Sequence, residues 1–71
     1  FLLEEKQYGQ KLNAALDKMP EKLRVTFLLN RIDGKKYREI SEILDISPKT
    51  VEHRMKNALE FLRDELGYFN R

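Results

Sequence analysis

Apolar residues recur at helical spacing through most of the chain, and the longest such run lies near its end. After Pro48 they follow one another at steps of four, three, four and four. The run consists of Val51, Met55, Ala58, Leu62 and Leu66. Steps of three and four keep side chains on one side of an α-helix. The pattern therefore predicts a helix over 48–66 with one buried stripe, and Gly67 is placed to end it.

The residues before Pro48 predict a second helix packed against the first. An apolar face recurs at helical spacing between residues 37 and 44 and consists of Ile40, Ile43 and Leu44. Asp45 tolerates the left-handed backbone that a tight turn needs, and Ile46 can fill the gap between two helices. Ser47 is a strong N-cap, and Pro48 loses no hydrogen bond at the first helical position. Two such helices joined by a short turn make a helix-turn-helix.

Two further helices are expected upstream, over 1–18 and 21–32, separated by Pro20. The first carries an apolar side made of Tyr8, Leu12, Ala15, Leu16 and Met19. The second has a core stripe of Leu23, Phe27 and Leu28, widened by Val25, Leu29 and Ile32. Gly34 follows and suits a helix end. The expected fold is all-α: one four-helix domain over 1–71, with the helix-turn-helix at its C-terminal end.

Composition limits the classes of protein to be considered. With 71 residues, the chain is long enough for one core but leaves little room for an enclosed active site. Charged residues make up 37%, yet the formal net charge is only +2, so overall charge does not prove a nucleic-acid partner. There is no cysteine, which excludes disulfides and thiolate metal sites and fits a cytoplasmic location. No apolar run is long enough to span a membrane.

The chain begins with Phe1 rather than methionine, which suggests a piece of a longer protein, taken from its end. Catalytic chemistry is poorly represented in this piece. There is a single histidine, His53, with no partner at metal-ligand spacing, and there is no glycine-rich phosphate loop. Glu39 and Glu42 are better interpreted as capping or solvated residues than as a catalytic pair. We therefore expect no enzymatic activity, no cofactor and no metal.

Donor-bearing side chains gather on the predicted last helix, opposite its apolar stripe. They are Lys49, Thr50, His53, Lys56 and Asn57. Basic residues cluster near the starts of the last two helices, at Lys35, Lys36, Arg38, Lys49, Arg54 and Lys56. Runs of charge are usually just solvated faces, and an exposed histidine is often an ordinary surface residue. Here, however, the charges lie where a helix-turn-helix meets DNA, so DNA contact is favoured.

Several short motifs at fixed distances point to a known family. Met19-Pro20 is followed by Arg24 and then by 27–29, Phe-Leu-Leu. The later part of the pattern consists of Gly34, Tyr37, Glu39-Ile40, Ile43-Leu44, Ile46-Ser47, Thr50-Val51, Arg54, Ala58 and Leu62. Together these residues resemble region 4, the C-terminal domain of bacterial sigma factors of the sigma-70 family, most closely the extracytoplasmic-function group. The resemblance covers roughly Leu12 to Leu66. Ser41, where the family usually has alanine, and Asp45, where glycine is common, depart from the pattern.

The resemblance implies a role in transcription initiation. Domains of this family recognise the promoter -35 element in double-stranded DNA and dock on the flap of the RNA polymerase β subunit; anti-sigma factors are further partners. Carried over by position, the base-reading residues are Lys49, Thr50, His53 and Asn57. The implied phosphate contacts are Lys36, Arg38, Arg54 and Lys56. The first two helices would form the flap-binding surface.

Two other interpretations remain open from the sequence. The stretch from Ser47 to Glu52 equally resembles the recognition helix of a LuxR-type response regulator, whose effector domain also binds DNA. The upstream Pro20 pattern favours a sigma factor over that alternative. A pure protein-interaction module is the third class, because the net charge is small.

Overall fold

The computed structural model describes residues 2–67, and side-chain surroundings are described from residue 10 onward. It contains helices α1 (Leu2–Lys18), α2 (Glu21–Arg31), α3 (Tyr37–Leu44) and α4 (Pro48–Leu66). No strand occurs within residues 2–67, so the predicted all-α fold is confirmed. Residues 1 and 68–71 lie outside the described structure, and so does the side chain of Tyr8, for which a core position was expected.

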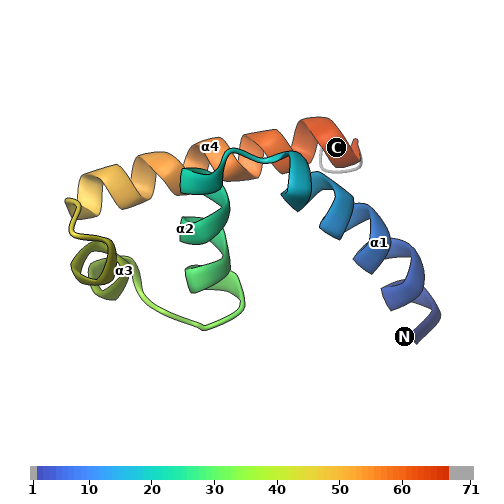
Figure 1. Ribbon diagram of the computed structural model, residues 1–71, viewed down its shortest axis with the longest axis horizontal. Coiled ribbons are helices and arrows are strands. Elements are labelled where there is room, and N and C mark those ends of the chain that lie inside the picture. Colours follow the sequence, from blue (N-terminus) through green and yellow to red (C-terminus); the bar gives the residue numbers. More distant parts are fainter. Residues whose placement is uncertain (1, 68–71) are drawn as a thin grey trace.

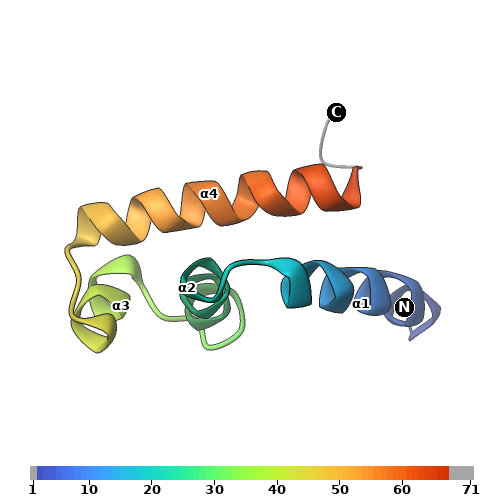
Figure 2. The ribbon, with the colours of Figure 1, turned by 45° about the horizontal axis from the view of Figure 1, so that its top comes forward.

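Helix α4 runs along most of the molecule, which extends 37 Å in its longest direction, and the other three helices lie along one side of it (Figures 1 and 2). Helix α3 packs near the start of α4, α2 crosses its middle, and α1 lies by its end. All three therefore share α4 as their common partner. This arrangement leaves the opposite side of α4 uncovered.

One hydrophobic core joins the four helices. Its buried apolar residues are Ala15, Met19, Phe27, Ile40, Val51, Met55, Ala58 and Leu62. Four of these eight come from α4, which confirms the stripe predicted from its spacing, and Leu66 packs at the edge of the core. Thr26 is also completely buried. Its hydroxyl donates to the Lys22 carbonyl at 2.8 Å, so it carries no unpaired polar group into the core.

Two isoleucines that the pattern assigned to the core are exposed. Ile43 is 54% exposed because α3 buries the side between Ile40 and Ser41, and Ile43 lies about 110° away from that side. Ser41 occupies the buried position instead and donates to the Arg38 carbonyl at 2.6 Å. Ile32 is 73% exposed because α2 ends one residue earlier than predicted, at Arg31, and the chain turns away there.

Hydrogen bonds to backbone carbonyls hold the connections between helices. At the end of α1, the Arg24 guanidinium donates to the Leu16 carbonyl at 3.3 Å and ties α2 to the preceding helix. After α2, Gly34 adopts the left-handed conformation expected of it, with φ 70°. The reversal that it permits lets the Lys35 N–H donate to the Leu29 carbonyl at 3.0 Å. Arg24, part of the family motif, thus has a structural role.

Candidate nucleic-acid interface

A three-residue turn sets α3 against α4. Asp45 adopts the left-handed backbone, with φ 57° and ψ 49°, as predicted for this position. The Ile46 N–H donates to the Ser41 carbonyl at 3.0 Å, and the Ile46 side chain packs against the core. Ser47 caps α4, because its hydroxyl oxygen accepts from the Thr50 N–H at 3.0 Å. These bonds fix the direction in which α4 leaves the turn.

The start of α3 has a cap of its own. The Glu39 carboxylate accepts from the Lys36 N–H at 2.8 Å, which satisfies a donor that precedes the helix. The capping role predicted for Glu39 is therefore confirmed. Lys36 and Arg38, two of the predicted phosphate contacts, lie exposed at this helix end.

The predicted base-reading residues lie on the uncovered side of α4. Lys49 and His53 are exposed, whereas Thr50 and Asn57 are half-buried at the edge of this face. The four residues, Lys49, Thr50, His53 and Asn57, are called the reading face below. Because the apolar stripe of α4 is buried in the core, as predicted, the opposite side of the helix stays open to solvent.

Internal contacts already orient parts of the reading face. The Asn57 amide nitrogen lies 3.2 Å from His53 Nε2, one helical turn away, so the two side chains form a pair. The Thr50 hydroxyl lies 2.9 Å from that of Ser47. Lys49 Nζ lies 3.9 Å from a carboxylate oxygen of Glu52, and both side chains remain largely exposed. Lys49 is thus a largely exposed donor, whereas the Asn57 amide is held by a neighbouring side chain.

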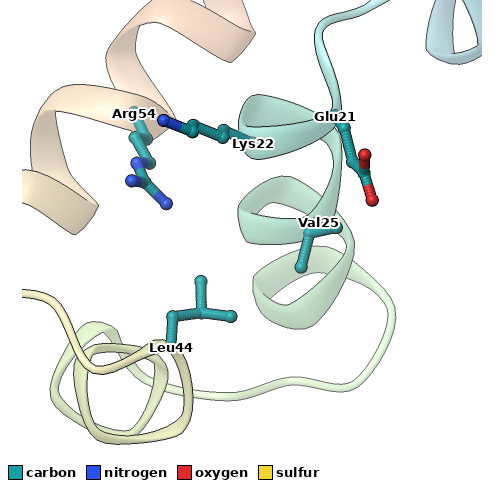
Figure 3. A pocket seen from close by; sticks show the side chains of 5 residues that line it. All are labelled: Glu21, Lys22, Val25, Leu44 and Arg54. Atoms are coloured by element: carbon teal, nitrogen blue, oxygen red, sulfur yellow. The ribbon is translucent and has the colours of Figure 1, made fainter.

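Of the predicted phosphate contacts, Arg54 differs from the others. Lys36, Arg38 and Lys56 are exposed, but Arg54 is half-buried. Figure 3 shows its guanidinium reaching from α4 into the space between α2 and α3, with the Lys22 side chain pointing towards Arg54. The two cations border a shallow pocket of about 200 Å³ between α2, α3 and α4. Sequence reasoning did not single out Lys22, because only the crossing of α2 over α4 brings it next to Arg54.

A second hollow of about 340 Å³ lies between α1, α2 and α4. Leu12, Phe27, Arg31, Ile32, Leu59 and Leu62 line it, and it is called the apolar groove below. Exposed Ile32 and Leu59 stand at its rim, and the Arg31 guanidinium carbon lies 5.9 Å from the centre of the Phe27 ring. The sequence pattern had assigned Ile32 to the core, so it did not predict this surface.

The described part of the chain offers no group of three or more histidine, cysteine or acidic residues that could hold a metal ion. Between residues 2 and 67, no helix is both long and apolar enough to cross a membrane.

Comparison with known proteins supports the resemblance noted in the sequence. The pattern that defines the family "Sigma-70, region 4" matches residues 9–62, which include α2 as well as the helix-turn-helix. The chain is also 35% identical over 63 residues to the ECF RNA polymerase sigma factor SigE of Mycolicibacterium smegmatis. That alignment covers 89% of this chain but only 24% of the relative, so the chain spans about a quarter of the relative's length.

A match to a helix-turn-helix alone would cover only α3 and α4. Because this match also covers part of α1 and all of α2, it favours a sigma factor over a response regulator. The chain belongs to the sigma-70 family, as a region 4 domain of the extracytoplasmic-function type.

Proposed function

We propose that this domain binds promoter DNA at the -35 element during transcription initiation, as the C-terminal part of a sigma factor. The observation that carries the proposal is the exposed donor face at the start of α4, opposite the stripe that fills the core. A major groove admits one helix presented in this way. The domain has no catalytic role in this proposal; it positions other components on the promoter.

Each residue of the reading face has a chemical role suited to base edges. Lys49 can donate to guanine O6 and N7, and the Asn57 amide can pair with adenine N6 and N7. The Thr50 methyl group can contact the methyl group of thymine. The His53 ring orients the Asn57 amide, because its Nε2 lies within hydrogen-bond distance of the amide nitrogen. Glu52 is exposed next to Lys49 and can accept from a cytosine amino group. Cations on both helices, Lys36, Arg38 and Lys56, would then bind phosphates.

The test is a selection of bound sequences from a randomised duplex pool, followed by fluorescence anisotropy at low salt. The wild-type chain should enrich a defined sequence, and Lys49→Ala combined with His53→Ala should weaken binding to it by tenfold or more, since each good base contact is worth about 1–3 kcal/mol. Lys11→Ala, which removes an exposed lysine from α1, is the control and should leave binding unchanged.

Two outcomes would contradict this function. A folded wild-type chain that enriches no sequence would exclude sequence-specific binding. Equal loss of affinity in the double variant and the Lys11 control would show that the reading face has no special role.

We also propose that the apolar groove is the docking surface for RNA polymerase, the enzyme in the name of the Mycolicibacterium relative. The expected surface comprised the first two helices, and the groove lies where both meet α4. Ile32 and Leu59 expose apolar side chains at its rim, on a surface that is otherwise strongly charged. The occupant would be an apolar segment of the β flap. Contact between that segment and the rim residues would bury apolar surface of both proteins.

A charge at the groove rim tests this assignment. Ile32→Glu should weaken binding to RNA polymerase core at least tenfold, because the carboxylate must lose its hydration in an apolar contact. Ile43→Glu is the matched control, since Ile43 is an exposed isoleucine on α3, away from the groove. Duplex binding should be unchanged in Ile32→Glu. Equal polymerase binding by both variants would place the docking surface elsewhere.

A further inference from the structure

The shallow pocket between α2, α3 and α4 combines an apolar lining with two cations. Val25 of α2 and Leu44 of α3 provide apolar walls, and Lys22 and Arg54 approach from α2 and α4 (Figure 3). Glu21 completes the lining. Three helices thus supply one small site that contains two cations, and its two cations come from parts of the chain that lie far apart in sequence.

Neither cation forms an ion pair with another side chain in the part of the chain that the structure describes. Figure 3 shows the Lys22 ammonium pointing towards Arg54, whereas the Glu21 carboxylate points away from both. The ion pairs found among the described side chains, Lys18–Glu65 and Lys49–Glu52, include neither group. Two positive charges line the same small pocket, and both would attract an anion bound there. The site therefore favours an anionic ligand.

The position of the site relative to the reading face indicates which anion it would bind. Arg54 directly follows His53, so the pocket lies along one flank of the reading face. The pocket lies at the end of α3, where Leu44 lines it, whereas Lys36 and Arg38 lie at the beginning of that helix. Eight helical residues span about 12 Å, which is close to the width of a major groove, about 12 Å.

We propose that Lys22 and Arg54 form a two-helix clamp for a phosphate of the DNA backbone. The clamp would hold one side of the groove, and Lys36 with Arg38 would hold the other. This inference rests on the proposed DNA binding and extends it to α2, outside the helix-turn-helix. The family resemblance already implied a phosphate contact for Arg54; the structure adds Lys22 and the pairing.

Salt-dependent binding to a fixed duplex tests the clamp. Lys22→Ala in the 71-residue chain should weaken binding about threefold for every duplex sequence, as expected for an exposed charge pair. The slope of log affinity against log salt should also fall by about 0.9, the value for one lost phosphate contact. Lys11→Ala is the matched control, because it removes the same charge from an exposed position on α1.

A double-variant cycle tests the pairing. Arg54→Gln retains much of the length of the side chain, and its fold is checked by circular dichroism. If both residues bind one phosphate, Lys22→Ala should weaken binding less in the Arg54→Gln background than in the wild type. Fully additive effects would show that the two residues do not share a ligand.

The outcomes separate the clamp from the proposed function. If Lys22→Ala behaves like Lys11→Ala while Lys49→Ala with His53→Ala still weakens binding, the clamp is wrong and DNA reading stands. If none of these variants differs from Lys11→Ala, both proposals fail. If Lys22→Ala weakens binding of a glutamate-rich peptide but not of duplex DNA, the site serves an acidic protein and the phosphate assignment is overturned.

Discussion

Helices α3 and α1 are attached to opposite ends of α4 in different ways. In the helix-turn-helix, Ile40 of α3 and Val51 of α4 are completely buried in the core, and a cap fixes each end of the turn. Helix α1 lies beside the far end of α4 (Figure 2) and contributes Ala15 to the core, and Met19 follows directly after the helix.

This difference matches the tasks proposed for the two regions. Base recognition needs donors held in fixed positions, and a fully packed, capped pair of helices provides them. Helix α1 instead borders the apolar groove through Leu12, where a protein partner would add the missing apolar contacts. The comparison predicts that the free energy of unfolding depends more strongly on the packing and caps of the helix-turn-helix than on the polar contact of α1.

The largest effect is expected from a cavity in the helix-turn-helix. Ile40→Ala should lower the free energy of unfolding by about 2–5 kcal/mol, because the side chain is fully buried. Ile43→Ala on the same helix should change it by about 0.5 kcal/mol or less, because that side chain is exposed. Urea denaturation followed by circular dichroism measures both. Similar losses in the two variants would contradict the burial described for α3.

An intermediate effect is expected at the cap of α4. Ser47→Ala removes the acceptor for the Thr50 N–H and should cost about 1 kcal/mol. Ser47→Asp is the control that retains an acceptor and should keep most of the stability. Thermal denaturation should show a decrease in Tm of about 4–8 °C for the alanine variant, as expected for a domain of this size. An unchanged Tm would show that the turn is held without this bond.

The smallest effect is expected at the ion pair between α1 and α4. Lys18 Nζ lies 3.4 Å from a carboxylate oxygen of Glu65, and the lysine side chain is largely exposed. Glu65→Gln should therefore cost no more than about 0.5 kcal/mol, and the difference from wild type should shrink with added salt. Chemical denaturation at low and high salt checks both statements. A loss as large as that of Ser47→Ala would mean that α1 depends on this pair.

Local signals in the sequence determined the helices and their ends. Ser47 and Pro48 start α4, Gly67 ends it with φ 80°, and Asp45 takes the left-handed turn, all as expected. The buried stripe of α4 also followed directly from its spacing. Each of these features depends on a residue and its neighbours within about one helical turn, so the chain order alone contains the information. The reading face was deducible as the side opposite the stripe.

Contacts between helices decided what the sequence left open. Periodicity shows which side of a helix is apolar but not which apolar residue meets a neighbour, so Ile32 and Ile43 were assigned to the core and lie exposed. Thr26 is not part of the apolar stripe predicted for its helix, yet it is buried, and its bond to a carbonyl of its own helix satisfies its hydroxyl. Lys22 meets Arg54 only because α2 crosses α4, 32 positions later in the chain. Such meetings depend on how the helices pack across one another, a property of the whole fold rather than of any single segment.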